Sequence, residues 1–409
     1  MKKFLLSLLV CVTFAGLFSC QKPNPTENSQ KKIQAAVDKI RKNLSDSLGI
    51  SFPSLSLIIQ TPTDKFFVTS TGDGAQVVTP GTYYRYASNT KPFTATAILN
   101  MFEDGWLDYK AKITDLIPGS KLPYVPADPG WDIPYKNEIT IKQLLQHVSG
   151  VIDVDNDPVP GYGGLTYTDA ILKKDPAHQF TTSEMVKVVT KIKESYGKPG
   201  AVYHYSNTGY SILAEIIKRV YTLKAGKNKT YADYMEEYVK GKYTRVPLPK
   251  IFFPILATDI SMPNPHLVST ILETSGPVKY DAVNLSAQLG EGNGYGTMEE
   301  LHKFLRTLSK GENVLKPATV KLMQTDVSTA NPEYGLGSSH TPNLGYGHNG
   351  ARLGSLNLMS YDPGHDVSVL VMIPLYDLRN GINSFGQCLF ALQDAGYAAR
   401  AVLGFPGKP

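Results

Sequence analysis

A serine followed by a lysine three residues later is the first pattern in this chain that could support catalysis. It occurs at Ser88 and Lys91, and also from Ser19, Ser29 and Ser195. A serine hydroxyl needs a nearby base to become a nucleophile, and a desolvated lysine can lose its proton near neutral pH. Ser88 stands at the start of an apolar helical segment, in which residues three apart share one face. The context therefore favours Ser88 as nucleophile and Lys91 as its base.

Tyr205 and Asn207, two residues apart, form the second candidate pattern. A tyrosine beside a lysine can move a proton between the nucleophile and the leaving group. An asparagine can donate a hydrogen bond to a substrate amide carbonyl. Tyr135 and Asn137 have the same spacing, but they lie beside a proline-rich loop. Tyr205 instead precedes a Ser-Asn-Thr-Gly turn and a helix, which favours it as the functional residue.

His348 and Gly350 form the third candidate, a His-x-Gly pattern that occurs once in the chain. A glycine in a strand lets a substrate backbone approach closely. A histidine there can orient the Tyr205 hydroxyl or assist the leaving group. The alternative is a structural histidine whose ring nitrogens are bonded within the protein.

The elements that must hold these residues follow from the hydrophobic pattern. Helices are predicted after Thr140 and over residues 31–48, 89–103, 182–193, 210–220 and 383–402. Strands are predicted over residues 55–60, 65–69, 354–361 and 366–372, and a long surface loop over 118–134. Strands from both ends of the chain around a helical middle predict an α/β fold of the α+β type. Its antiparallel sheet is flanked by helices, and a mainly helical lobe, about 87–284, is inserted in the α/β lobe.

The N-terminus predicts export and lipid attachment. Residues 1–19 combine two lysines with a short apolar run that ends Leu17-Phe18-Ser19-Cys20, which resembles a bacterial lipobox. Cleavage before Cys20 would leave its thiol for lipid attachment, whereas an ordinary signal peptide with a chance cysteine is the alternative. Residues 20–30 predict a flexible tether and 31–409 the folded domain. We therefore expect a lipid-anchored protein of the bacterial cell envelope, in the periplasm or at the cell surface.

Composition limits the expected partners and cofactors. The net charge of +5 is small, and no basic stripe with interleaved aromatic residues predicts a nucleic-acid partner. The eight histidines are scattered, and no Asp-rich or His-Glu motif predicts a metal, so we expect no cofactor. Cys388 lies in an apolar stretch, which favours a buried and unreactive thiol.

The three patterns occur in an order that resembles the serine β-lactamase and penicillin-binding-protein superfamily, in particular its class C and D-Ala-D-Ala carboxypeptidase branch. The intervals from 88 to 205 and from 205 to 348 also suit that branch. The resemblance runs from about residue 31 to the C-terminus. Segments that carry it include residues 86–87, 93–97, 103–108, 144–150, 334–337 and 347–350.

This resemblance implies a mechanism in which Ser88 is acylated while Lys91 and Tyr205 exchange its proton. It implies an oxyanion held between the N–H groups of Ser88 and Ala351, with Asn207 holding the substrate amide. His348 and Gly350 complete the implied substrate-binding strand. His147 matches a recurring His-x-Ser-Gly segment and is interpreted as structural. No metal or organic cofactor is implied.

One departure narrows the implied activity. Residues 348–350 read His-Asn-Gly where many class C β-lactamases have Lys-Thr-Gly, and this form is similar to carboxypeptidases, D-aminopeptidases and esterases of the same branch. Asn349 alters a hydrogen bond to a substrate carboxylate, which Arg352 can supply unless it is a solvated surface residue. The resemblance thus implies a D-Ala-D-Ala carboxypeptidase, or a related hydrolase of D-amino-acid peptides or amides. The alternatives are a β-lactamase, a small-ester esterase, and a non-catalytic envelope binding or scaffold protein.

Overall fold

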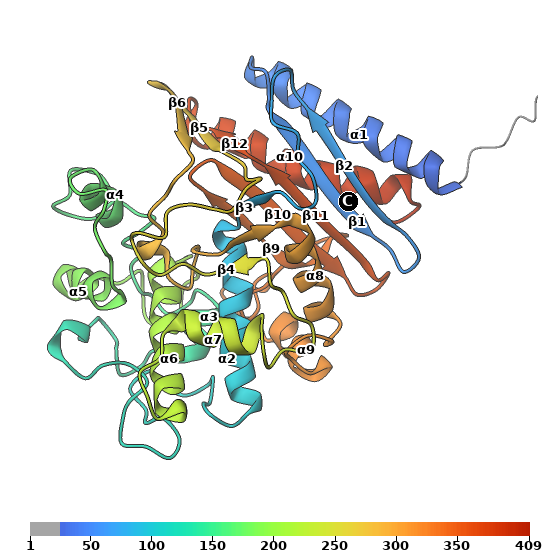
Figure 1. The fold of residues 1–409 in the computed structure, drawn as a ribbon. Helices are drawn as coiled ribbons and strands as arrows, with labels where there is room; N and C mark the ends of the chain where they lie inside the picture. The colour runs from blue at the N-terminus through green and yellow to red at the C-terminus, as the bar shows by residue number, and fades with distance from the viewer. Residues whose placement is uncertain (1–24) are drawn as a thin grey trace, which may run out of the picture.

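A six-stranded antiparallel sheet forms the centre of the computed structural model, which describes residues 25–409 (Figure 1). Its strand order is β2-β1-β11-β10-β9-β8, so the first two strands of the chain join four strands from its C-terminal part through the pairing of β1 with β11. The strands are β1 (Ser54–Gln60), β2 (Lys65–Thr71), β8 (Ser339–Thr341), β9 (Gly345–Arg352), β10 (Ser355–Asp362) and β11 (Val367–Ile373). The predicted fold class is therefore confirmed.

The central strands are apolar on both faces because both faces of the sheet are covered. Every residue of β11 is buried, and β1 is buried along nearly its whole length. Strands enclosed on both sides read as continuous apolar runs, whereas the edge strand β2 alternates between buried and more exposed positions. Strands β1, β2, β10 and β11 were predicted to within about two residues at each end, whereas β8 and β9 were not among the predicted strands.

Two long helices, one from each end of the chain, cover one face of the sheet (Figure 1). They are α1 (Pro25–Leu48) and α10 (Gly381–Val402). Ile33 and Val37 of α1 pack with Leu392 of α10 and with sheet residues such as Leu57 in one core cluster. Cys388 lies in the same cluster, is fully buried and is a free thiol, as the sequence predicted.

Helix α1 begins at Pro25 rather than at residue 31, so the predicted tether is wrong over residues 25–30. Polar contacts extend the helix: Glu27 forms an ion pair with Lys31 at 2.6 Å, and Gln30 Nε2 donates to the Phe67 carbonyl at 2.8 Å. The predicted signal, Cys20 and the rest of the tether lie outside the described residues. Over the described part of the chain, no helix is long and apolar enough to cross a membrane.

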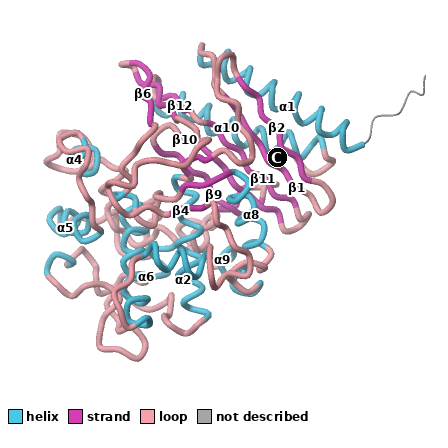
Figure 2. The backbone as a smooth tube through the Cα atoms, viewed as in Figure 1, coloured by secondary structure: helices cyan, strands magenta, loops and turns pink. Residues whose placement is uncertain are grey.

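The opposite face of the sheet meets the helical lobe. Helix α2 (Lys91–Glu103) runs through the middle of this lobe. Buried residues lie on all sides of the helix, as expected for a helix enclosed by protein. The remaining helices are α3 (Ile141–Leu145), α4 (Tyr167–Leu172), α5 (Thr182–Ile192), α6 (Asn207–Ala225), α7 (Tyr231–Tyr234), α8 (Met298–Ser309) and α9 (Pro317–Thr325). Figure 2 shows how much of the lobe is loop.

Two departures from the prediction occur in these loops. The predicted loop over 118–134 is a loop with one short turn, Pro129–Trp131, but it is only partly superficial because Tyr124 and Trp131 are buried. The helix after Thr140 has the expected cap, with Thr140 and Gln143 in a capping box, but it ends at Leu145 rather than at Gly150, the glycine at which the sequence predicts its end.

Two small three-stranded sheets were not predicted. One has the order β12-β5-β6, and the other β3-β7-β4. Their strands span two to five residues, which is too short for a readable alternation of apolar residues. They are β3 (Tyr83–Arg85), β4 (Ile251–Phe252), β5 (Ser269–Glu273), β6 (Gly276–Tyr280), β7 (Tyr295–Thr297) and β12 (Leu375–Asp377).

The packing of α1 makes a testable contribution to stability. Replacing fully buried Ile33 by Ala should lower the free energy of unfolding by about 2–5 kcal/mol, because it removes buried methyl groups and leaves a cavity. Chemical denaturation measures this change. The neighbouring exposed residue provides the control, and Lys32→Ala should change stability little. Equal effects of the two substitutions would contradict the placement of α1 against the sheet.

Candidate active site

Ser88 lies in a 3₁₀ turn, Ala87–Thr90, that joins β3 to α2. Ala87 adopts a left-handed conformation with φ of 49°, which costs a non-glycine residue about 1–3 kcal/mol. Tyr86 is the N-cap residue of the turn and Thr90 is the N-cap residue of α2, and neither side chain forms a capping hydrogen bond. Ser88 therefore does not occupy a capping position, and the strain next to it indicates a site shaped for function.

Lys91 is fully buried at the start of α2. Its Nζ donates to Ser88 Oγ at 3.0 Å, to Asn207 Oδ1 at 2.8 Å and to the Glu291 carbonyl at 2.9 Å. Burial lowers the pKa of Lys91 to about 8, although the carboxyl groups of Glu291 and Asp153 oppose this shift. A lysine with this pKa can give up its proton near neutral pH and accept one from Ser88.

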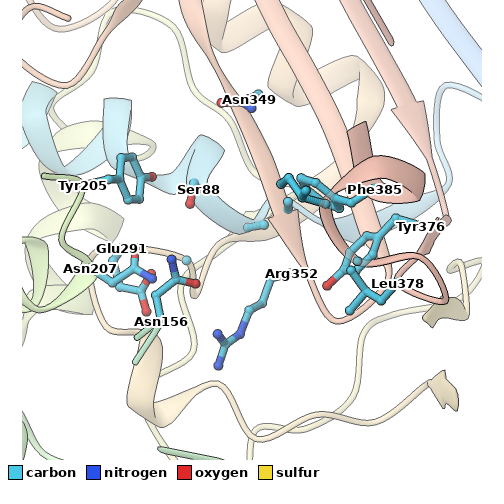
Figure 3. Close-up of a pocket in the computed structure, with 15 residues that line it drawn as sticks. Ser88, Asn156, Tyr205, Asn207, Glu291, Asn349, Arg352, Tyr376, Leu378 and Phe385 are labelled. Carbon is cyan, nitrogen blue, oxygen red and sulfur yellow. The ribbon is translucent and has the colours of Figure 1, made fainter. Parts of the chain in front are cut away.

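The Tyr205 ring lies beside Lys91, with Nζ 4.7 Å from the ring centroid. Its hydroxyl points toward Ser88 (Figure 3). Burial raises the pKa of this hydroxyl well above its ordinary value, and the proximity of Ser88 opposes the rise only in part. Among the described residues the buried hydroxyl has no well-directed hydrogen-bond partner. Tyr205 is thus a neutral donor, placed to exchange a proton with an atom that enters the site.

His147 holds Tyr205 in place. The two rings stack with centroids 4.0 Å apart, and His147 Nδ1 accepts a hydrogen bond from the Ser206 N–H at 3.0 Å. Burial lowers the pKa of His147 well below its ordinary value, so the ring is neutral. The structural interpretation of His147 fits this arrangement, but its contact with Tyr205 was not foreseen.

Asn207 begins helix α6, directly after the N-cap residue Ser206. Its side-chain oxygen accepts from Lys91, and its backbone N–H donates to Asp153 Oδ2 at 2.7 Å. Asn207 also lines the cavity described below. Asn207 therefore orients Lys91, a role that comes in addition to the substrate contact that the sequence predicts.

Four ionisable residues near Lys91 form a network, of which the sequence analysis noted only Arg352. Arg352 Nη2 donates to Asp155 Oδ1 at 3.1 Å, and Glu291 Oε2 lies 3.6 Å from Lys91 Nζ. Burial and the neighbouring Asp155 raise the pKa of Asp153 to about 7 and that of Glu291 well above its ordinary value. Asp153, Asp155 and Glu291 lie in loops outside any motif, so nothing in the sequence marked them.

Arg352 is neither a solvated residue nor a free cation. With the Gln288 amide oriented so that its oxygen faces the guanidinium, that oxygen accepts from Nε at 2.9 Å and from Nη2 at 3.2 Å. Nη1 donates to the Asp155 carbonyl at 3.3 Å. Burial lowers the pKa of Arg352, but Asp155 and Glu291 together raise it above its ordinary value. Most of its donors are thus engaged within the protein.

Strand β9 carries the His-Asn-Gly pattern of residues 348–350, but the residue of this pattern that reaches the cavity is not the histidine. His348 is buried, with Nε2 2.8 Å from the Tyr334 hydroxyl, and burial lowers its pKa to about 3. Both ring nitrogens are bonded within the protein, the second to the Asn349 carbonyl. Asn349 and Ala351 line the cavity, whereas His348 does not. The expected substrate contact therefore fits Asn349 rather than His348.

Gly350 permits a close approach within the protein. A Cβ at this position would lie 2.2 Å from the Tyr86 carbonyl oxygen, in the segment that leads to Ser88. The sequence suggested instead that a substrate backbone would approach this glycine. Gly350 thus sets the distance between β9 and the Ser88 turn, while Ala351 lines the cavity as expected.

A cavity of about 630 Å³ opens beside Ser88. One side is polar, and the other is formed by apolar residues of β12 and the first turns of α10 (Figure 3). The polar side holds Ser88, Tyr205, Asn207, Glu291 and Asn156, and the apolar side holds Tyr376, Leu378, Ile382 and Phe385. The arrangement can bind a small molecule with one polar and one apolar end at the Ser88 hydroxyl.

Ser195, which also has a lysine three residues later, lies in a loop. Its hydroxyl contacts the carbonyl oxygens of Gly150 and Gly197 at 2.7 and 2.8 Å, which favours a structural role over that of a second nucleophile. Among the described residues no group of histidine, cysteine, aspartate and glutamate side chains could hold a metal ion.

Comparison with known families and proteins agrees with this geometry. A family model described as Beta-lactamase matches residues 43–374. Protein flp of Staphylococcus aureus strain MW2 is 28% identical over 220 residues, which are 52% of this chain and 36% of that protein. The chain therefore spans little more than a third of this curated relative.

Solved structures match over much more of the chain. The D-amino acid amidase of Ochrobactrum anthropi SV3, complexed with L-phenylalanine amide, has a TM-score of 0.68 and 19% identity, covering 91% of this chain and 99% of that chain. A D-stereospecific amidohydrolase from Streptomyces sp. has a TM-score of 0.64 and 23% identity, covering 83% and 94%. At these identities the likeness shows the shared fold.

The lowered pKa of Lys91 predicts the pH dependence of acylation. The neutral amine is the form that accepts the Ser88 proton, and it becomes the main form above about pH 8. The rate constant for acylation should therefore rise about tenfold per pH unit below pH 8 and level off above it. Stopped-flow or quenched reactions with an acylating substrate from pH 6 to 10 measure this profile.

A Lys91→Arg variant is the control, because a guanidinium stays protonated at all these pH values. It should lose acylation throughout the range. A parent profile that is flat, or that rises only near the ordinary lysine pKa of 10.5, would argue against Lys91 as the base.

Proposed function

The chain belongs to the Beta-lactamase family of serine hydrolases, and we propose that it hydrolyses D-amino-acid peptides or amides through an acyl-enzyme on Ser88. The observation that carries this proposal is the contact of 3.0 Å between Ser88 Oγ and the fully buried Lys91 Nζ. A serine with a desolvated amine within hydrogen-bond distance is the arrangement that nucleophilic catalysis needs.

In the proposed acylation, Ser88 Oγ attacks the substrate carbonyl carbon and its proton passes to neutral Lys91. Negative charge develops on the carbonyl oxygen, toward which the N–H groups of Ser88 and Ala351 donate. The C–N bond then breaks, and the leaving amine receives a proton by way of Tyr205. In deacylation a water molecule attacks the ester carbon, gives its proton to the same pair, and Ser88 is regenerated as an alcohol.

Within this class, the side-chain contacts favour amides and peptides over substrates recognised by a terminal carboxylate. Arg352 is the cationic residue among the described residues that line the cavity, and its donors are engaged by Asp155 and Gln288. Recognition of a terminal carboxylate needs an available cation. The more specific D-Ala-D-Ala carboxypeptidase activity therefore stays a prediction, whereas the solved amidase and amidohydrolase with this fold make D-amino-acid amides the substrates to test first.

The apolar side of the cavity suits the substrate side chain. Tyr376, Leu378 and Phe385 face the Ser88 side across the cavity (Figure 3). Burial of an apolar side chain there contributes about 25 cal/mol for each Å² removed from water. Aromatic or branched aliphatic D-amino acids are thus the expected acyl groups. We also propose, from the sequence alone, that Cys20 carries a lipid anchor and that the substrate is met in the cell envelope.

Trapping of the acyl-enzyme tests the proposal. Intact-protein mass spectrometry after incubation with benzylpenicillin should show a single covalent adduct on the parent protein and none on Ser88→Ala. The unfolding temperature of the variant should stay close to that of the parent, because the Ser88 hydroxyl occupies no capping position.

Hydrolysis of D-phenylalaninamide, followed by release of ammonia, should likewise require Ser88. A parent that forms no adduct and hydrolyses neither amide nor ester would favour the non-catalytic binding protein. Rapid consumption of penicillin without turnover of the amide would favour a β-lactamase.

A further inference from the structure

We propose that Glu291 binds the free ammonium group of the substrate, so that the enzyme selects D-amino-acid amides and peptides with an unblocked amino end. The inference rests on the proposed function and adds to it a specificity residue. Glu291 lies in the loop before β7 and lines the cavity together with Ser88 and Asn207 (Figure 3).

The first supporting observation is an unsatisfied acceptor. Glu291 is 3% exposed, and its Oε1 is buried without a hydrogen-bond partner among the described residues. A buried carboxyl oxygen without a donor is unfavourable, because it has lost its hydrogen bonds to water without replacement. Such a cost is retained where a ligand supplies the missing donor.

The donors nearest to Glu291 are already engaged. In its protonated form Lys91 Nζ has three N–H groups, and its contacts with Ser88, Asn207 and the Glu291 backbone carbonyl use all three; the neutral amine has only two N–H groups to donate. Arg352 donates to Asp155 and to Gln288. The neighbouring Asp155 is itself a carboxyl group, so a substrate N–H that enters the cavity lined by Glu291 would supply a donor that these neighbours do not.

The position of Glu291 suits an ammonium group. In a D-amino-acid amide the amino group is attached to the carbon next to the carbonyl that Ser88 attacks. Ser88 Oγ and Glu291 Oε2 lie 3.0 and 3.6 Å from the same Lys91 Nζ, and both residues line the cavity that the reacting end must enter. A carboxyl at that distance can contact the amino group while the carbonyl is at Ser88.

The charge of the site also favours a cation over an anion. Burial is the main cause of the raised pKa of Glu291; the excess of negative charge that Asp155 contributes raises it further, and Lys91 and Arg352 oppose the rise. A substrate ammonium reduces that excess and provides up to three N–H donors. A substrate carboxylate at the same place would add to it.

Paired substrates test the inference. The specificity constant kcat/KM is measured for D-phenylalaninamide and for N-acetyl-D-phenylalaninamide, which lacks the ammonium charge. The parent should prefer the free amine. Glu291→Gln should lower kcat/KM for the free amine by about 10- to 100-fold more than for the acetylated substrate, the range expected for one charge-assisted hydrogen bond.

Two further variants complete the design. Glu291→Asp keeps the carboxylate and should retain part of the preference for the free amine. Glu333→Gln makes the same chemical change at an exposed glutamate outside the cavity and should leave both constants unchanged. Turnover of the acetylated substrate shows that each variant is folded.

The outcomes separate the inference from the proposed function. An equal loss on both substrates in Glu291→Gln would mean that Glu291 acts through Lys91, and it would overturn the ammonium site while Ser88 catalysis stands. A parent that hydrolyses the acetylated amide as well as the free amine overturns it too. Failure of the parent on both substrates would instead overturn the proposed function, and the inference with it.

Discussion

Burial of the Lys91 ammonium group is the constraint on which the site depends. A charge that leaves water is costly unless acceptors surround it, and this nitrogen has three within 3.0 Å. Those acceptors come from the Ser88 turn, the start of α6 and the loop before β7. Removal from water lowers the pKa of the lysine, while nearby carboxyl groups raise it, and the balance is a value of about 8. The same contacts that make burial tolerable therefore bring the nucleophile, the amide of Asn207 and the acidic residues together.

The scaffold supports this arrangement by holding α2 in the middle of the helical lobe, with the turn that precedes it against β9 of the sheet. The left-handed backbone conformation of Ala87 sets the direction of the turn that carries Ser88 to the start of that helix. Gly350, which has no Cβ, lets β9 approach the Tyr86 carbonyl and brings Ala351 to the cavity. His147 fixes the position of the Tyr205 ring by stacking against it and by accepting a hydrogen bond from the neighbouring Ser206 N–H. Each of these three residues fixes the distance between groups at the site and takes no part in the proposed proton transfers. Each is adjacent, in space or in sequence, to a residue that lines the cavity.

The sequence predicted what is local and repetitive. The Ser88–Lys91 spacing lies on one helical turn, β1 and β11 are continuous apolar runs, and α1 has a helical period of apolar residues. These features could be predicted and are found in the structure. Short strands such as β12 have no period, and the start of α1 depends on contacts such as that between Gln30 and Phe67. Asp153, Asp155 and Glu291 could not be identified because their importance arises from proximity across loops. His348 lies on β9, but its Nε2 is bonded to Tyr334 and it does not line the cavity, which the sequence pattern could not predict.

The acidic network explains why specificity and catalysis cannot be separated at this site. Asp153 accepts from the backbone of Asn207, whose side chain in turn accepts from Lys91. Asp155 pairs with Arg352 at 3.1 Å, and it raises the pKa of both Asp153 and Glu291. A change in the ionisation of one carboxyl therefore alters the field at the others and at the lysine, because all of them are buried and weakly screened. A substrate charge that enters beside Glu291 acts on the same coupled set of groups as the proton taken from Ser88. Recognition of the substrate and the proton affinity of the catalytic base are thus two consequences of one buried charge distribution.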